Sequence, residues 1–150
     1  METKIEKEWI DTGLGFPIRL TNVPMIKVRG IWTPKINYNA LTRLVLRALA
    51  NKPARLTGNE IKFIRTHFEL TLQEFGGRFC VTHVAVLKWE KTQDKATLMH
   101  WTTEKDIRLF LLSKLSPKEK EWMHLYQSLV VLPKGRSKPI DLDAEDLLAA

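Results

Sequence analysis

Apolar residues recur at helical spacing through the middle of the chain, between residues 56 and 91. The pattern predicts three short helices, and the connections between them are too short for anything but a compact corner. Gly76 and Gly77 lie in the second predicted helix, where two helices would cross closely. The third predicted helix starts after Thr82, a residue type that commonly caps helices. The apolar positions that define the three helices are Ile61, Ile64, Phe68, Leu72, Phe75, Phe79, Val86 and Trp89.

The N-terminal third of the chain predicts β structure followed by one helix. Residues 1–12 alternate weakly and predict a short strand or an ordered arm. Residues 17–33 predict a small antiparallel hairpin whose turn lies at residues 22–24, Asn-Val-Pro. Residues 40–50 predict a helix that is too short to be stable alone and must dock on another element. Its buried stripe is expected to consist of Leu41, Leu44, Val45 and Leu49.

Two further helices are predicted toward the C-terminus. One runs from about residue 103 to residue 114, with Ile107 and Phe110 on its core face. The other starts at Pro117, with Ser116 as its N-cap, and continues to about residue 129.

The chain is expected to hold one ordinary-sized domain with flanking segments. Residues 1–55 form a strand-plus-helix segment that packs on the core. Residues 56–132 form the central helical domain together with its C-terminal helices. Residues 133–150 form a linker and an acidic tail, whose last ten residues are either disordered or a short amphipathic helix that folds on a partner.

Charge is distributed unevenly along the chain. The net charge is +7, and residues 1–58 carry ten Lys/Arg against four Asp/Glu. The last twelve residues carry four acidic side chains and no basic one. A basic body with an acidic end suits a polyanionic partner such as nucleic acid, although solubility alone also accounts for a basic chain. With 44% hydrophobic and 27% charged residues, the composition indicates a globular protein rather than a disordered one.

The sequence indicates a cytoplasmic protein. It contains no run of about 18 apolar residues that would span a membrane. The first eleven residues lack the apolar core of a signal peptide. Cys80 is the single cysteine, which excludes an internal disulfide and a cysteine-rich zinc site.

Motifs for catalysis or cofactor binding are missing. The four histidines are scattered, and a Cys80–His83 pair offers too few ligands for a metal ion. Gly13 and Gly15 are not followed by a phosphate-binding or dinucleotide-binding fingerprint. Asp-Thr-Gly at residues 11–13 lacks the flanking strands of an aspartic protease. We therefore expect no metal, no cofactor and no catalytic residues, and we do not expect an enzyme.

Three blocks of the central stretch form a recognisable pattern: L-T-G-x-E-I-x-F-I-R at residues 56–65, L-T-x-x-E-F at 70–75 and V-T-x-x-x-V-x-x-W-E at 81–90. These blocks resemble the Xre/Cro-type helix-turn-helix family, and most closely its MqsA-like (YgiT-type) transcriptional regulators and antitoxins, without their zinc domain. The resemblance covers residues 37–115. It implies a mainly α fold, an Xre- or lambda-repressor-like helix-turn-helix domain with a small N-terminal β element. The matched residues are Leu56, Thr57, Gly58, Glu60, Ile61, Phe63, Ile64, Arg65, Leu70, Thr71, Glu74, Phe75, Val81, Thr82, Val86, Trp89 and Glu90.

The resemblance also implies roles for individual residues, because a helix-turn-helix presents its last helix to a DNA major groove. Val81, Val86 and Trp89 would hold the third helix on the first two. Glu90 would pair with a backbone group or with Arg65. The helix period then turns the opposite face of the third helix outward. The residues expected to contact DNA are Gln73, Thr82, His83, Val84, Leu87, Lys88 and Lys91.

The chain departs from the family pattern in three ways. The family usually has glutamine at the position of Leu72, whereas the glutamine here is Gln73, about 100° further round the helix. The family usually has glycine at the position of Cys80. If that turn requires a positive φ, the cysteine costs on the order of 1 kcal/mol. The third helix is unusually apolar over residues 83–87, so that exposed Val84 and Leu87 indicate either readout of thymine methyl groups or a protein interface on a module that does not read DNA.

These features predict a sequence-specific DNA-binding transcriptional regulator, a repressor that binds double-stranded DNA as a homodimer on a palindromic operator. One alternative is an antitoxin-like or adaptor protein that binds a protein partner, such as a toxin, through the N-terminal segment or the acidic tail. Another is an accessory DNA-binding protein of a phage or mobile element. An apolar stripe on the last predicted helix forms either the dimer surface or a packing face against residues 103–114. This stripe consists of Trp122, Leu125, Tyr126 and Leu129.

Overall fold

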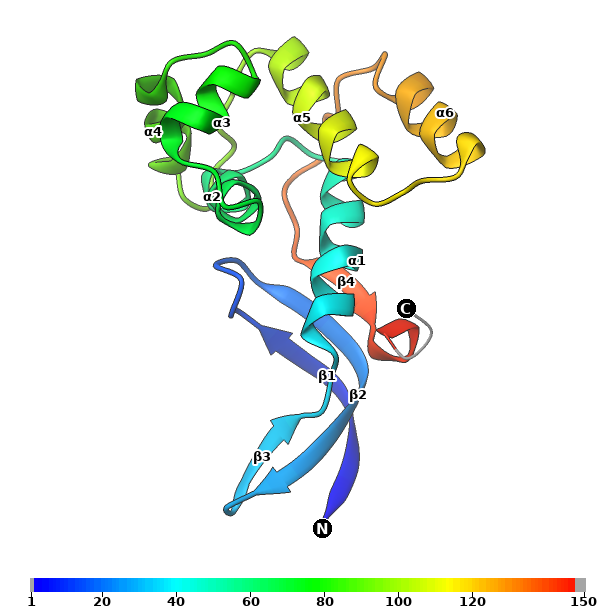
Figure 1. The fold of residues 1–150 in the computed structure, drawn as a ribbon. Helices are drawn as coiled ribbons and strands as arrows, with labels where there is room; N and C mark the ends of the chain where they lie inside the picture. The colour runs from blue at the N-terminus through cyan, green and yellow to red at the C-terminus, as the bar shows by residue number, and fades with distance from the viewer. Residues whose placement is uncertain (1, 148–150) are drawn as a thin grey trace. The chain divides into compact units, whose positions relative to one another are not determined.

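The computed structural model describes residues 2–147, and in this range it contains six α-helices, four strands and one 3-10 helix (Figure 1). Helices account for 45% of the structure and strands for 22%. The elements follow in the order β1 (Thr3–Asp11), β2 (Ile18–Val28), β3 (Ile31–Pro34), α1 (Tyr38–Ala50), α2 (Gly58–His67), α3 (Leu72–Arg78), α4 (His83–Glu90), α5 (Trp101–Ser113), α6 (Glu119–Ser128), β4 (Ile140–Asp143) and η1 (Ala144–Leu147).

Contacts within the chain divide it into two compact units. The first unit joins the segment up to Val45 with the segment from Pro139 onward, and it holds all four strands. The second unit, Leu46–Lys138, holds helices α2 to α6. Helix α1 begins in the first unit and ends in the second.

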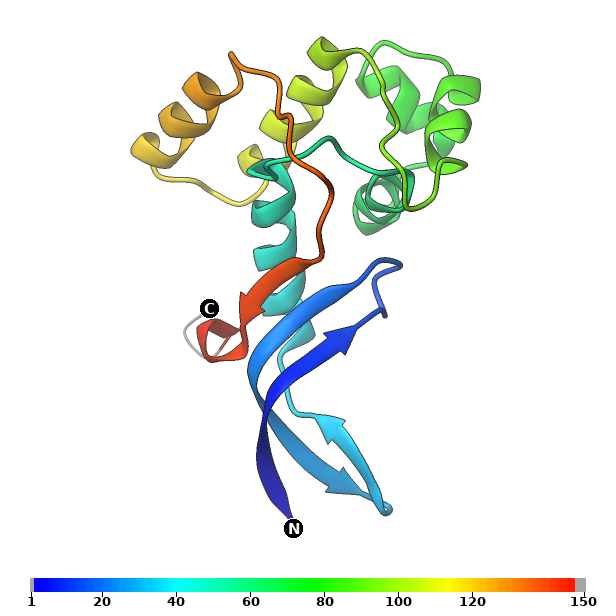
Figure 2. The same ribbon diagram turned by 180° about the vertical axis from the view of Figure 1, so that it is seen from behind.

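Strand β2 is the centre of the sheet in the first unit. β1 pairs with it antiparallel, from Thr3 opposite Ile26 to Asp11 opposite Ile18. On the other edge of β2, β3 pairs antiparallel with its second half and β4 pairs parallel with residues 18–21. Figure 2 shows β4 lying alongside β2. The sheet is therefore mixed, and β1 is one of its edges.

The turn predicted at residues 22–24 was wrong, because β2 runs continuously through these positions. The turn between β2 and β3 lies at residues 29 and 30 instead. Asn22 adopts a φ of 54°, a left-handed conformation that bends the strand without ending it. Buried residues alternate with partly exposed ones on both sides of Asn22, but the alternation shifts by one residue there. In the sequence this shift looks like the end of one strand and the start of another. The buried positions are Ile18 and Leu20 before Asn22, and Val23 and Met25 after it.

The acidic end of the chain belongs to this sheet as far as it is described. β4 pairs with β2, and Ala144 and Leu147 of η1 are buried. Arg19 Nη1 donates to Asp141 Oδ1 at 3.1 Å, so a basic side chain of β2 meets an acidic one of β4. Residues 148–150, the last of the predicted acidic tail, lie outside the described residues.

The predicted mainly α, Xre- or lambda-repressor-like fold was wrong. A four-stranded mixed sheet accompanies the six helices, so the chain has an α/β fold. The β content was underestimated because residues 1–12 were expected to form only a short strand or an arm, and residues 140–143 were not expected to form a strand. The pairing of β4 with β2 also joins positions 122 residues apart, a relationship that no local pattern predicts. No helix in residues 2–147 combines the length and the apolar character needed to cross a membrane.

The helices of the second unit lie close to where the sequence places them. α5 begins two residues before the predicted start at residue 103, and α6 begins at Glu119 rather than at residue 117. α2 and α3 each begin with a capping box, in which Thr57 pairs with Glu60 and Thr71 with Glu74. Large apolar side chains that are fully buried in this unit include Leu46, Leu49, Leu56, Ile61, Ile64, Phe75 and Ile107.

Candidate nucleic-acid interface

The inner face of α4 packs against the chain as the helix period predicts. Val86 is fully buried and Trp89 is 9% exposed. On α3, a Cβ added at Gly76 would lie 2.7 Å from the backbone oxygen of Val81, in the turn that precedes α4. Only a residue without a side chain allows this close approach. Packing and glycine together hold α4 close to α3.

The turn between α3 and α4 has the hydrogen bonds of a Schellman motif. The Val81 N–H donates to Gly76 O at 2.9 Å, and the Cys80 N–H donates to Gly77 O at 3.5 Å. Cys80 has a φ of 60°, the left-handed position that this motif normally fills with glycine. The turn therefore does require a positive φ at residue 80, which was the condition for a steric cost at Cys80.

Thr82 caps α4, as predicted. Its hydroxyl oxygen accepts a hydrogen bond from the Ala85 N–H at 3.2 Å, and its backbone is extended. The cap fixes where α4 begins and therefore which side chains the first turn presents to solvent.

Glu90, the last residue of α4, pairs with Arg65 of α2, which was one of the two partners expected for it. Arg65 Nε lies 2.6 Å from Glu90 Oε2, and Arg65 Nη2 lies 3.0 Å from Glu90 Oε1. Arg65 Nη1 also donates to Leu70 O at 3.0 Å. The hydrogen bond with Glu90 raises the pKa of Arg65, and partial burial opposes that rise. The carboxylate of Glu90 is thus neutralised within the fold.

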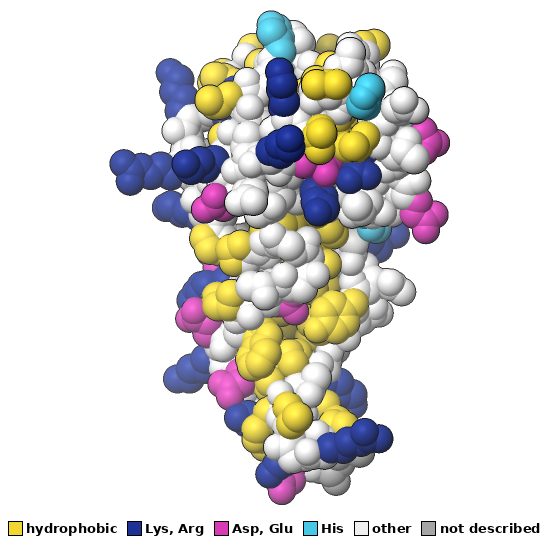
Figure 3. Space-filling model, turned by 90° about the vertical axis from the view of Figure 1, so that its left-hand side faces the viewer, with side chains coloured by type: hydrophobic (Ala, Val, Ile, Leu, Met, Phe, Trp, Pro, Cys, Tyr) yellow, Lys and Arg dark blue, Asp and Glu magenta, His cyan; other side chains and the backbone are white. Residues whose placement is uncertain are grey.

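The outer face of α4 is open to solvent. His83 and Lys88 are exposed, Val84 is 47% exposed and Leu87 is 39% exposed. Figure 3 views the side on which α3 and α4 lie in Figure 1, and Lys and Arg side chains surround exposed hydrophobic side chains there. Three further residues expected at the DNA are also exposed, namely Gln73, Thr82 and Lys91.

The region from residue 56 to residue 95 presents more basic than acidic side chains to solvent. Five Lys/Arg and three Asp/Glu are exposed there. Two further carboxylates, those of Glu60 and Glu90, are held in ion pairs with Lys52 and Arg65. A polyanion approaching α4 would therefore meet a net positive surface.

Three of these exposed basic residues were not among the candidate contacts. Lys62 lies on α2 and Lys95 follows α4. Arg78 ends α3, and its guanidinium lies 3.3 Å from Asp106 in an exposed ion pair. The sequence shows only that these residues are charged. Which lysines and arginines can contact a polyanion depends on burial and on ion pairing, and both follow from the fold.

No family model, curated protein or solved structure matches the chain. The resemblance to MqsA-like regulators therefore rests on the three sequence blocks alone.

The four candidate dimer residues on α6 and just after it lie in different environments. Leu125 is 1% and Leu129 4% exposed, so both are buried within the chain's own fold. Trp122 is half-buried, and Tyr126 is 57% exposed. The exposed large apolar side chains of this segment are Met123, Tyr126, Val130, Val131 and Leu132.

The residues weighed for other chemistry do not assemble into a site in residues 2–147. No group of three or more His, Cys, Asp or Glu side chains there could hold a metal ion. Asp11 of the Asp-Thr-Gly segment stabilises its own turn, because its Oδ1 accepts from the Gly13 N–H at 2.8 Å. The Tyr38 hydroxyl donates to Asp11 Oδ2 at 3.4 Å, and burial together with that carboxylate raises the pKa of Tyr38.

Proposed function

We propose that the chain is a sequence-specific DNA-binding regulator of transcription and that α4 enters the major groove. The observation that carries the proposal is the division of α4 into two faces. Val86 and Trp89 fasten one face to the fold, and the opposite face exposes His83, Val84, Leu87 and Lys88. An α-helix fits the major groove, which is about 12 Å wide.

The charges around α4 support the same proposal. Phosphate contacts by Lys and Arg supply most of the non-specific affinity for DNA. Lys88 lies in the last turn of α4, Lys91 is at its C-cap, and Lys95 follows shortly after in the chain. The neutralisation of Glu90 by Arg65 removes an anion that would repel the phosphates.

A single helix reads only a few base pairs, so we propose that two copies bind two half-sites about one helical turn apart. A palindromic operator follows from that symmetry. Binding at the chain's own promoter would make the protein a repressor.

The test is a titration of the full chain against the duplex upstream of its own gene and against a random duplex, each at two salt concentrations. Lys88→Ala is compared with Lys120→Ala, which removes an exposed lysine from α6. We expect tighter binding to the upstream duplex. Lys88→Ala should weaken binding, while Lys120→Ala should have no effect. Equal affinity of the wild-type chain for both duplexes would refute sequence-specific regulation.

A second candidate function is binding to a protein partner, as in an antitoxin or an adaptor. The exposed apolar side chains of Met123, Tyr126, Val130 and Val131 favour it, because a cluster of this kind often marks a protein interface. Tyr126→Asp would separate the two functions. It should abolish partner binding and leave the affinity of a single α4 for half-site DNA unchanged.

A further inference from the structure

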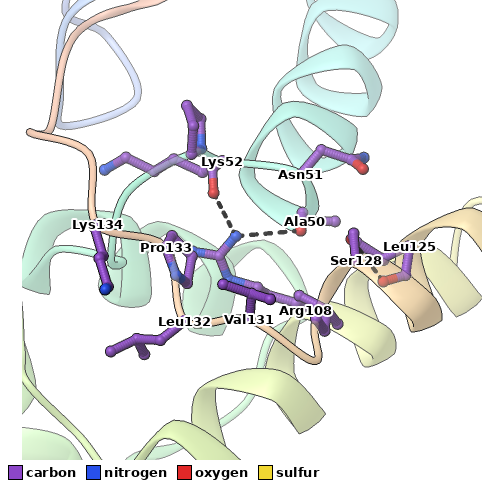
Figure 4. Close-up of a pocket in the computed structure, with 12 residues that line it drawn as sticks. Ala50, Asn51, Lys52, Arg108, Leu125, Ser128, Val131, Leu132, Pro133 and Lys134 are labelled. Atoms are coloured by element: carbon purple, nitrogen blue, oxygen red, sulfur yellow. Dashed lines mark hydrogen bonds between the residues drawn. The ribbon is translucent and has the colours of Figure 1, made fainter.

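A pocket of about 480 Å³ lies within the second unit, between the end of α1, the end of α6 and the segment that follows α6 (Figure 4). Its volume is in the range of ligand-binding pockets, about 300 to 1,000 Å³. Most of its wall is apolar. The apolar side chains come from the second half of α6 and the next few residues, namely Leu125, Leu129, Val131, Leu132 and Pro133.

The charged residues that line this pocket all carry the same sign. They are Lys52, Arg108 and Lys134, and no Asp or Glu lines it. An apolar pocket with basic residues and no acidic one is complementary to an anion with an apolar body.

The buried ion pairs beside the pocket leave one positive charge without a counter-charge. Lys52 Nζ lies 2.7 Å from Glu60 Oε1, which neutralises that pair. Arg55 and Arg108 both bind Glu104, at 2.9 Å each, and share its single negative charge. This set of five side chains therefore contains three cations and two carboxylates. Because all of them are buried or nearly so, water compensates the extra charge poorly.

Arg108 is fixed in place and acts on the pocket through its charge. Its Nη1 donates to Lys52 O at 2.6 Å and to Ala50 O at 3.4 Å, as Figure 4 shows, and its Nη2 donates to Ala54 O. Backbone carbonyls at the end of α1 and just beyond it thus receive its hydrogen bonds and offset part of its charge. Lys134 supplies a movable donor, because it is exposed and makes no hydrogen bond or ion pair with residues 2–147.

We propose that this pocket binds a small organic anion with an apolar body, such as an aromatic or aliphatic carboxylate. The carboxylate pairs with Lys134 in the field of Arg108, and the body packs on Leu129, Val131 and Leu132. The inference is independent of DNA binding, because none of the pocket residues belongs to α4.

The test uses two probes that share one aromatic body, 1-naphthoate and the 1-naphthylmethylammonium ion. Each is titrated into the ¹⁵N-labelled full chain, and the amide shifts are followed by NMR. We expect naphthoate to shift the signals of residues 50–52, 128–132 and 134, and the ammonium probe to leave them unchanged. Equal binding of both probes, no binding, or shifts outside these residues would overturn the proposal.

Two charge reversals locate the anion. Lys134→Glu should weaken naphthoate binding by about fivefold or more, the loss expected when an exposed ion pair becomes a repulsion. Lys95→Glu makes the same charge change at an exposed lysine that does not line the pocket, and it should leave binding unchanged. Ser128→Trp, at an exposed position on the pocket wall, should block binding by filling the space. Full naphthoate affinity in Lys134→Glu, or an equal loss in both charge reversals, would contradict the assigned site.

Discussion

Arg65 and Glu90 form a two-pronged ion pair that joins the last turn of α2 to the last residue of α4. The side chains are 16% and 8% exposed, so water screens the pair only weakly. It fixes the end of α4 opposite to the end that Thr82 caps. The outer face of α4 is therefore anchored at both ends by residues that do not themselves belong to that face.

Glu90→Gln should lower the free energy of unfolding by about 1 to 3 kcal/mol, because it leaves the Arg65 guanidinium half-buried without its counter-charge. Urea denaturation measures the loss. Asp106→Asn is the matched control, because it breaks the Arg78–Asp106 pair, which is 47% and 48% exposed. We expect the control to change stability by less than about 0.5 kcal/mol. Equal losses in the two variants would show that burial does not strengthen the Arg65–Glu90 pair.

Cys80→Gly should stabilise the chain by about 0.5 to 1 kcal/mol, because glycine adopts the positive φ of this position without the steric cost of a Cβ. Cys80→Ala removes the thiol and keeps the Cβ, so it should bring no gain. The denaturation midpoints of the wild-type chain, Cys80→Gly and Cys80→Ala are compared to test this prediction. A gain in Cys80→Ala as large as in Cys80→Gly would assign the effect to the thiol instead of to the backbone.

Gly76 and Gly77 are adjacent in α3 and should respond to alanine in opposite ways. Gly76→Ala should destabilise the chain by about 1 to 3 kcal/mol, because the new Cβ meets Val81 O at 2.7 Å. A Cβ at Gly77 has no neighbour within 4 Å. Gly77→Ala should therefore stabilise the helix by about 0.5 to 1 kcal/mol. Thermal unfolding of both variants tests the prediction, and a loss of stability in Gly77→Ala would contradict it.

If α4 enters the major groove, its exposed apolar pair Val84 and Leu87 should contact thymine methyl groups. Replacing thymine by uracil in a bound duplex removes these methyls and keeps every hydrogen-bonding group. We expect a loss of about fourfold in affinity per contacted methyl, from about 0.8 kcal/mol for each buried carbon group.

Leu87→Ala should reduce the difference between the thymine and uracil duplexes. Leu98→Ala, at a residue outside α4 that is 76% exposed, should not. Equal binding of thymine and uracil duplexes would exclude methyl contacts while leaving DNA binding itself intact.

Local features of this fold could be predicted from sequence because they depend on neighbouring residues. The spacing of Val86 and Trp89 determines which face of α4 is buried, and Thr82 marks where the helix begins. The conformation of Cys80 could be stated only as a condition, since a turn's φ depends on the hydrogen bonds that close it.

Long-range relationships could not be predicted in this way. The strand character of residues 140–143 depends on pairing with β2, far away in the chain. Leu125 and Tyr126 are adjacent apolar residues, yet one is buried and the other exposed, because helix α6 has only one side against the fold. The burial of Lys52 likewise depends on Glu60 and on Ser137, which accepts a hydrogen bond from Lys52 Nζ at 2.7 Å.

The parallel pairing of β4 with β2 has a consequence for the order of folding. β1, β2 and β3 leave the ribosome early, whereas β4 is made only after the whole of Leu46–Lys138. The helical unit can form while the edge of β2 that receives β4 is still unpaired. Closure of the sheet must then wait for β4, so it is expected to be a late and slow step of folding.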